Sequence, residues 1–572
     1  MNTGNRRSEL VEKDPAAGDP PRTPGSGTDR RSFLRRVGAG ATGAVAVGLA
    51  WPGAARGDEP RTGSEASAEQ AADSAGDQRI KDAQQIRVDA AELAASRPQP
   101  GHPNNGEETL YGNRIASYSK ALPHNALGEV DSKAYKALLS ALASGRHSDF
   151  ESIPLGSGGR RLTNPQAGYA FDLEGADSHH MAIPPAPTIA KAEAASELAE
   201  LYWMALARDV NFLDYESDAT IAAAGNELSR FSDFQGPRNG NGQVTAGTIF
   251  RGNTAGDRIG PWLSQFLWLD IPMGAVQFPQ RMQTTVSGDD YLTRYDEWLA
   301  VQNGFRPGGN RFDSDARYIR NLRDIAQWVH VDALYQAYHQ ACLILLGMGA
   351  PFDAGNPYIT SVCQDGFGTF GGPHILSLVT EVATRALKAV WYQKWLVHRR
   401  LRPEAFGGLV HHTKSGTAKY PVHPQILNAK VLDRIFSARG TYLLPTAFPE
   451  GCPTHPSYGA GHATVAGACV TILKAWFDEK SVLPRPVVPD RTGRLLNPYS
   501  GPDLTVGHEL DKLAANVAIG RNAAGIHYRS DYAQSVLLGE ALALDVLEEQ
   551  KQTYNEDFSF TLTRFDGKTV TI

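Results

Sequence analysis

Residues 375–403 read ILSLVTEVATRALKAVWYQKWLVHRRLRP. Their apolar members recur every three or four positions, at Ile375, Val379, Val382, Ala386 and Val390. This spacing predicts a helix over residues 375–398 with one buried face. Lys394 lies one turn beyond Val390 near the same face, so its ammonium should point inward and need an anionic partner.

The same spacing continues through most of the chain after Tyr111. It predicts further helices over residues 188–209, 320–347, 462–477, 508–524 and 530–549. Long alternation of apolar and polar residues, which is typical of strands, is absent from the sequence. Long loops rich in glycine and proline join the helices. The sequence therefore predicts a mainly α protein built from packed helical bundles.

The composition is that of a globular protein, with 572 residues, 41% of them hydrophobic, and a formal net charge of -6. The lack of a basic excess argues against nucleic-acid binding. Residues 56–110 are rich in small and polar residues and are predicted to be a linker, with one marginal helix near residues 79–96. Beyond them we distinguish an N-terminal helical part, residues 111–340, and a C-terminal part, residues 341–572.

The start of the chain is typical of an export signal. Residues 1–29 are polar and predicted to be disordered. RRSFLRR follows at residues 30–36, then an apolar run over residues 37–51 and the small residues GAA at 53–55. This order predicts a twin-arginine signal within residues 1–55, and hence export to the cell envelope or the medium. The alternative is a membrane anchor; the short apolar run, rich in glycine and alanine, disfavours it, so no stable membrane association is expected.

The four cysteines fall into two pairs by sequence context. Cys342 and Cys469 lie in apolar helical patterns and are predicted to be buried thiols. Cys363 and Cys452 lie in loop-like sequence, where a disulfide between them stays open.

Three clusters of residues carry the chemistry, and the first is the end of the helix over residues 375–398. Pro403 should end this helix, because the residue before a proline is kept out of the α region. Arg402 would then lie at the mouth of the helix. Arg399 and Arg400 are interpreted as an ordinary basic helix end, favoured by the helix dipole.

The second cluster is a glycine-rich turn, HPSYGAGHAT at residues 455–464, which leads into an apolar helix. The first N–H groups of a helix lack partners within it, so this end favours anions. Gly461 lets the backbone approach a ligand closely, and His462 is placed to exchange a proton. Taken alone, the pattern is also that of an ordinary helix start.

The third cluster is RNAAGIHYRSD at residues 521–531. Arg521 continues the apolar face of its helix, so its guanidinium should point into the core. A buried guanidinium needs a carboxylate or an oxyanion. Gly525 then breaks the helix before His527. Taken alone, a helix-capping arginine and a buried structural histidine explain this cluster as well.

Together the clusters predict one site for a tetrahedral oxyanion. A buried lysine and two buried arginines would neutralise two or three negative charges. A helix N-terminus would add hydrogen bonds from the backbone. Two histidines would remain, one for proton transfer and one for direct attack or ligation.

The three clusters resemble the three-part signature of the vanadium-dependent haloperoxidases and type 2 acid phosphatases. The matching patterns are Lys394-x7-Arg402-Pro403, Pro456-Ser457-x3-Gly461-His462 and Arg521-x5-His527. The similarity to the algal-type haloperoxidases extends from about Tyr111 to Asp557, and the export signal suggests a bacterial member. The resemblance implies a mainly helical fold with two four-helix bundles, and a C-terminal part that carries the site.

The resemblance also implies a cofactor and residue roles. Vanadate would be the cofactor, and phosphate would compete for the same site. His527 would ligate vanadium, and His462 would be the acid–base residue. Lys394 would also polarise the peroxide. The groups that would hold the vanadate oxygens are Lys394, Arg402, His462, Arg521 and the amide of Gly461. The further pocket residues would be His455, Trp391 and Ser457.

Two departures from the family pattern bear on activity. Ala460 stands where the family usually has serine, and Gly459 where it has proline. One hydrogen bond to a vanadate oxygen would therefore be missing, and such a bond is worth about 1.5–3 kcal/mol. Trp391 stands where bromide-selective relatives tend to have arginine, which favours chloride oxidation.

The resemblance implies oxidation of chloride or bromide by hydrogen peroxide, followed by halogenation of a small organic substrate. That substrate would be an electron-rich aromatic or a terpenoid, such as a meroterpenoid precursor. A homodimer or a larger homo-oligomer is expected. Two alternatives stay open: non-oxidative rearrangement of an α-hydroxyketone on the same fold, and phosphate-ester hydrolysis with His527 as the nucleophile.

Overall fold

The computed structural model describes residues 63–572, with side chains from residue 75 onwards. The predicted disordered start and export signal, residues 1–55, lie outside the described residues and stay predictions. Residues up to Asp77 form one unit, and Gln78–Ile572 form a second, compact unit that contains the candidate site. Among residues 63–572, no helix combines the length and the apolar character needed to cross a bilayer.

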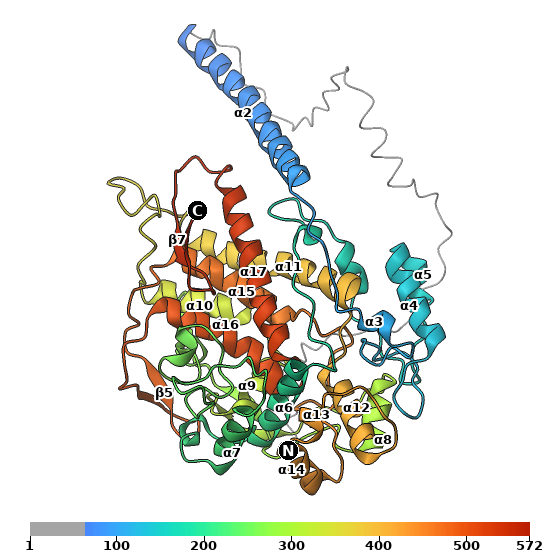
Figure 1. Ribbon diagram of the computed structural model, residues 1–572. Coiled ribbons are helices and arrows are strands. Elements are labelled where there is room, and N and C mark those ends of the chain that lie inside the picture. Colours follow the sequence, from blue (N-terminus) through green and yellow to red (C-terminus); the bar gives the residue numbers. More distant parts are fainter. Residues whose placement is uncertain (1–62) are drawn as a thin grey trace, which may run out of the picture. The chain divides into compact units, whose positions relative to one another are not determined.

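Helices dominate the described chain (Figure 1). The α-helices are α2 (Gly63–Ser96), α3 (Glu107–Leu110), α4 (Ser132–Ser144), α5 (His147–Glu151), α6 (Ala192–Ala207), α7 (Ala219–Leu228), α8 (Tyr295–Gln302), α9 (Leu322–Trp328), α10 (Gln336–Gly347), α11 (Gly372–Tyr392), α12 (Pro403–Ser415), α13 (Pro424–Leu427), α14 (Lys430–Arg439), α15 (Gly461–Trp476), α16 (Val506–Ala523) and α17 (Arg529–Gln550). The short 3₁₀-helices are η1 (Pro165–Tyr169), η2 (Ser178–His180), η3 (Phe212–Asp214), η4 (Gly256–Arg258) and η5 (Gln265–Leu267), and η6 (Gln393–His398) is a π-helix. The mainly α prediction is confirmed.

The strands are short and form only two-stranded antiparallel sheets within the described chain. The pairs are β1 (Ile271–Met273) with β2 (Val276–Phe278), β3 (Met282–Thr285) with β4 (Phe312–Arg317), β5 (Val487–Pro489) with β6 (Leu496–Pro498), and β7 (Thr561–Thr563) with β8 (Thr569–Thr571). Strands this short leave little room for the alternating pattern that marks longer strands.

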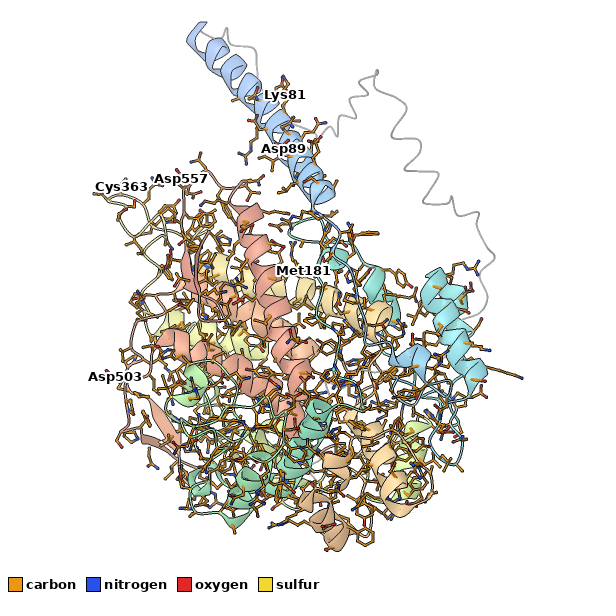
Figure 2. All side chains as sticks on the ribbon, in the orientation of Figure 1. Lys81, Asp89, Met181, Cys363, Asp503 and Asp557 are labelled. Atoms are coloured by element: carbon orange, nitrogen blue, oxygen red, sulfur yellow. The ribbon has the colours of Figure 1, made fainter. Side chains whose placement is uncertain are left out.

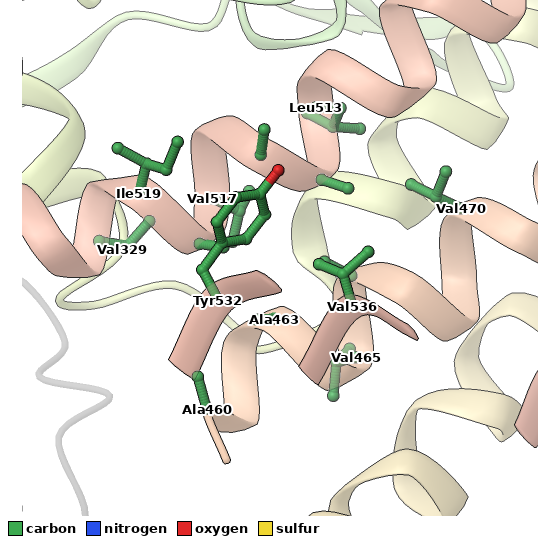
Figure 3. Close-up of a cluster of buried hydrophobic side chains, with 14 of the residues drawn as sticks. Val329, Ala460, Ala463, Val465, Val470, Leu513, Val517, Ile519, Tyr532 and Val536 are labelled. Carbon is green, nitrogen blue, oxygen red and sulfur yellow. The ribbon is translucent and has the colours of Figure 1, made fainter. Parts of the chain in front are cut away.

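Four helices of the C-terminal part form the bundle that positions the site. α15 lies at its centre and packs against α11, α16 and α17 (Figure 1). Apolar side chains of these helices meet in one cluster, which includes Ala463, Val517 and Val536 (Figure 3). α15 and α17 approach closely because both carry glycine at the contact. A Cβ on Gly467 would strike the backbone of Val536, and one on Gly539 would strike α15.

Three helix predictions need correction, although α6, α15, α16 and α17 match theirs within a few residues. The helix predicted over residues 320–347 is two helices, α9 and α10, because residues 329–335 leave the helix to hydrogen-bond distant loops. The marginal helix near residues 79–96 is the longer α2, whose alanine-rich, proline-free sequence favours a helix. α3 also falls within the predicted linker, so regular structure begins before Tyr111.

All four cysteines are free thiols. Cys342 and Cys469 are fully buried, which confirms the prediction for these two residues. Cys452 is buried as well, whereas Cys363 lies on an exposed loop (Figure 2). The disulfide left open between Cys363 and Cys452 is not formed.

Candidate functional site

The three sequence clusters converge on one cavity of about 310 Å³. Its walls include six residues that the sequence singled out: Trp391, His455, Gly461, His462, Arg521 and His527. Lys394 and Arg402 are fully buried behind this wall. Arg402 donates to the Nε2 atom of His527 and to the ring of His455, and Lys394 donates to the carbonyl of Pro456.

The structure places Arg402 differently from the prediction. The helical segment that begins with α11 ends at His398, where Arg399 adopts a left-handed conformation. Pro403 is the first residue of α12, and Arg402 is its N-cap. Proline is well suited to that position because a first-turn N–H needs no helical partner. Arg402 therefore enters the site from the start of one helix, and Lys394 from the end of another.

Three buried cations of the site have no carboxylate within ion-pair distance, judged over the described residues. Lys394 donates to the carbonyls of Pro456 and Ser457, at 2.8 and 3.1 Å. Arg402 bonds only carbonyls and histidine rings. Arg521 donates one bond, to the carbonyl of Val329, and its Nε is buried without a partner.

Every other buried lysine and arginine of the described chain has an acidic partner. These pairs are Lys120–Glu404, Arg208–Asp290, Arg323–Asp209, Arg400–Asp531, Lys474–Asp511, Lys512–Glu509 and Arg529–Glu200. Since a buried unpaired charge is expensive, the three exceptions mark a place where an external anion belongs.

Burial acts on the protonation of these groups. It lowers the pKa of Lys394 well below its usual value, and the nearby charge of Arg402 lowers it further. Burial also lowers the pKa of Arg521 to about 10. A bound oxyanion would oppose both effects by favouring the charged forms. The site is therefore suited to binding an anion.

His527 presents a defined nitrogen to the cavity. Its Nδ1 lies 2.8 Å from Oδ2 of Asp531, and a carboxylate can only accept there, so Nδ1 carries the proton. Nε2 is therefore unprotonated, and its lone pair accepts from a guanidinium nitrogen of Arg402 at 3.1 Å. Burial and the charge of Arg402 lower the pKa of His527 well below its usual value. A neutral imidazole with an orientated Nε2 is a suitable metal ligand.

The start of α15 supplies backbone donors. The first N–H bond within the helix is that of Thr464 to the carbonyl of Ala460, so the preceding N–H groups have no helical acceptor. Ala460 is the N-cap and has no side-chain cap. Its own N–H donates to Oγ of Ser535 at 2.7 Å.

His462 has a partner that suits proton transfer. Its Nε2 lies 3.0 Å from Oδ1 of Asp332, and the two side chains are 17% and 4% exposed. Asp332 belongs to the segment between α9 and α10, where the sequence predicts a continuous helix. A histidine that faces a cavity and is orientated by a carboxylate is a typical general acid–base group.

The three further pocket residues take different places. Trp391 lines the cavity, stacks obliquely on His455 with ring centroids 4.8 Å apart, and lies 5.7 Å from the Lys394 ammonium. His455 accepts a hydrogen bond from Arg402 at 2.9 Å. Ser457 is fully buried and donates its hydroxyl to Asp531, so it supports His527 from behind instead of facing the cavity.

Asp332, Asp531 and Arg400 are site residues that the sequence interpretation missed. Arg400 was assigned to a basic helix end, but it is buried and bonds Asp531 at 2.7 Å and Glu197 at 3.0 Å. A signal for Asp531 did exist, because it lies four residues after His527 at a helix start. No comparable local signal marks Asp332.

These features are those expected of a helical protein that binds an oxyanion between buried cations, with one histidine suited to metal ligation and one suited to proton transfer. The comparisons with known proteins agree with this class. A family model described as the second helical-bundle domain of VCPO matches residues 375–556, the region of the bundle around α15.

Curated relatives cover most of the chain. A vanadium-dependent bromoperoxidase from Corallina pilulifera is 39% identical over 589 residues, spanning 86% of this chain and 98% of that protein. Another from Ascophyllum nodosum is 38% identical over 491 residues, spanning 82% and 87%. A solved homohexameric structure, the second vanadate-dependent bromoperoxidase of Ascophyllum nodosum, has a TM-score of 0.84 and 28% identity, over 94% of this chain and 95% of that one.

The chain belongs to the vanadium-dependent haloperoxidase family. It is a haloperoxidase with a vanadate cofactor, as the family resemblance implied.

Proposed function

We propose that this haloperoxidase oxidises bromide, and also chloride, with hydrogen peroxide and delivers the oxidised halogen to an organic acceptor. The observation that carries the proposal is the set of three buried cations without carboxylates, Lys394, Arg402 and Arg521, around the Nε2 atom of His527. The bromoperoxidase relatives support bromide. Trp391 in the cavity wall, where bromide-selective relatives tend to have arginine, supports chloride.

The donor set fits vanadate. Lys394, Arg402 and Arg521 would hold its oxygens together with the amide of Gly461, and the neutral Nε2 of His527 would be the metal ligand. The orphaned Nε of Arg521 is one donor that the protein itself leaves for such a group. Bound vanadate supplies a Lewis acid that activates hydrogen peroxide without a change of metal oxidation state.

The protein's own groups would move the proton and place the charge. His462, held by Asp332, would take a proton from hydrogen peroxide and later return one to the leaving oxygen. The Lys394 ammonium, fixed by two carbonyls, would keep positive charge beside the oxygen that develops negative charge.

The homohexameric Ascophyllum relative supports a homo-oligomeric assembly here, which light scattering of the purified protein measures.

A halogenation assay with and without vanadate tests this proposal. Protein stripped of metal should show no halogenation of monochlorodimedone, and added vanadate should restore it with bromide and, more slowly, with chloride. Phosphate should inhibit by competing for the same cations. Metal analysis of the restored protein should find vanadium. Turnover of an α-hydroxyketone without peroxide, vanadate or halide would instead favour rearrangement, and hydrolysis of a phosphate ester would favour a phosphatase.

Ala460→Ser should raise the affinity for vanadate. The new hydroxyl would cap α15 and add one donor beside the oxyanion. A hydrogen bond to a charged group is worth about 1.5–3 kcal/mol. The dissociation constant for vanadate should therefore fall by about tenfold or more. Equilibrium dialysis with vanadium analysis measures it. Ala460→Gly, which adds no hydroxyl, should give no such gain; an equal gain in both variants would contradict the explanation.

A further inference from the structure

A histidine–glutamate pair lies in the cavity wall outside the acid–base pair already described. Nε2 of His330 is 2.6 Å from Oε1 of Glu450, and both side chains are about a quarter exposed, at 21% and 28%. His330 also lies flat on Phe448, with ring centroids 3.7 Å apart and planes 8° apart. The pair and Phe448 all line the cavity.

The backbone beneath this pair is held firmly. Lys120, which is buried and paired with Glu404, donates to the carbonyl of Glu450 at 2.7 Å and to the carbonyl of Cys452 at the same distance. Glu404 in turn accepts from the N–H of Cys452. The Glu450 carboxylate is therefore carried on a rigid loop, as a preorganised binding group requires.

Each member of the pair keeps one polar atom open. Over the described residues, neither Oε2 of Glu450 nor Nδ1 of His330 has a hydrogen-bond partner. Burial raises the pKa of the Glu450 carboxyl, but the hydrogen bond and charge of His330 lower it by more, so the group is ionised at neutral pH. An ionised carboxylate repels halide, so halide binding alone does not account for Glu450.

Apolar side chains line the same cavity. Leu334, Leu387 and Trp391 are half-buried, and Pro453 is a further lining residue. A volume of about 310 Å³ is at the lower end of pockets for small organic ligands. Apolar side chains beside a fixed acceptor are typical of a site for a ring that carries a hydroxyl group.

We propose that the cavity binds a phenolic acceptor, whose O–H donates to Glu450 and whose ring contacts apolar side chains of the cavity lining. This inference rests on the proposed function for its halogen source. An alkene without a hydroxyl group would leave the open oxygen of Glu450 unused. The acceptor would therefore be held at the halide-oxidising site instead of reacting only in solution.

The chemistry balances without a further reagent. Hypohalous acid made from peroxide and halide gives its halogen to a ring carbon, forming a carbon–halogen bond. That carbon loses its hydrogen as a proton, and the oxygen of the hypohalous acid leaves as water. A phenol O–H that donates to a carboxylate is richer in electrons, which speeds the attack of its ring on the halogen. Glu450 is in this sense a binding group that also activates the acceptor.

Competition between phenol and anisole tests the inference, because the two differ by the O–H donor. The ratio of the phenol bromination rate to the anisole bromination rate should be at least about tenfold higher with the enzyme than with added hypobromous acid. Tenfold is the preference that one hydrogen bond to a charged group confers. Glu450→Gln and His330→Gln should bring the ratio down towards that of hypobromous acid. Titration calorimetry should show phenol binding more tightly than anisole, with or without vanadate.

The matched control is His179→Gln. His179 forms an equally short pair with a carboxylate, Asp177, at 2.6 Å, and it lies outside the cavity wall. This control should keep both halide oxidation and the wild-type ratio. A wild-type ratio equal to that of hypobromous acid would overturn the inference while leaving halide oxidation intact. If halide oxidation itself were missing, the proposed function would fail, and calorimetry with phenol and anisole would still decide the inference.

Discussion

His527→Ala should abolish vanadate-dependent halide oxidation, with a loss of at least about 10³-fold. Loss of a single donor to developing charge costs about 10²–10³-fold in other enzymes, and here the metal ligand itself would be removed. The hydrogen bond of Nδ1 to Asp531 keeps Nε2 of His527 unprotonated, and alanine offers no ligand atom in its place. Vanadium retained after equilibrium dialysis should fall in parallel with activity.

An exposed histidine provides the control for this variant. His147→Ala should keep full activity and full vanadium content, because His147 lies on the surface at the start of α5. Thermal unfolding of the metal-free proteins shows whether loss of the buried ring has damaged the fold. If His527→Ala kept full activity and the thermal stability of the wild type, the assignment of His527 as the metal ligand would be refuted.

Asp531→Asn should weaken vanadate binding by about 10–100-fold, the usual cost of removing a partner that orientates a metal ligand. The carboxylate can only accept from Nδ1 of His527, which keeps Nε2 free. An asparagine can donate its amide to Nδ1 instead, which would move the proton to Nε2 and block ligation. The variant should therefore bind vanadate weakly even though every group that faces the cavity is still present.

The stability of this variant should also depend less on pH. Burial raises the pKa of Asp531, but Arg400 and the hydrogen bonds from His527 and Ser457 lower it by more, so its pKa is below the usual range in the folded protein. Such a group stabilises the fold above its unfolded pKa of about 3.9, and the contribution is lost as the pH falls. Asp177→Asn, at a half-buried histidine pair outside the cavity, is the control. Unchanged vanadate affinity in Asp531→Asn would refute the tautomer argument.

The helices of the bundle were predictable because burial on one face is a local, periodic property. α15, α16 and α17 begin and end within a few residues of the predicted ranges. The inward direction of Lys394 and Arg521 followed from the same periodicity, and both are buried. The two-stranded sheets were not predictable, since strands of three to six residues carry too little pattern.

The partners of the site residues could not be predicted, because they come from distant segments. Asp332 reaches His462 across 130 positions of sequence, from a segment that interrupts a periodic pattern. Arg400 looked like a helix end because its local sequence is basic, yet Glu197 and Asp531 bury it. The roles of Lys394, Arg402, Gly461, His462, Arg521 and His527 as cofactor ligands stay predictions until the variants above are measured.

The glycine contact between α15 and α17 has a consequence for how the cofactor is acquired. Gly467 and Gly539 bring the two backbones together, and these helices carry Gly461 at one start and Asp531 at the other. The packing of the two helices against each other thus holds Gly461 and Asp531 in position without any contact to vanadate. We therefore expect the arrangement of these helices to be the same with and without the cofactor, so that loading requires only diffusion of the anion.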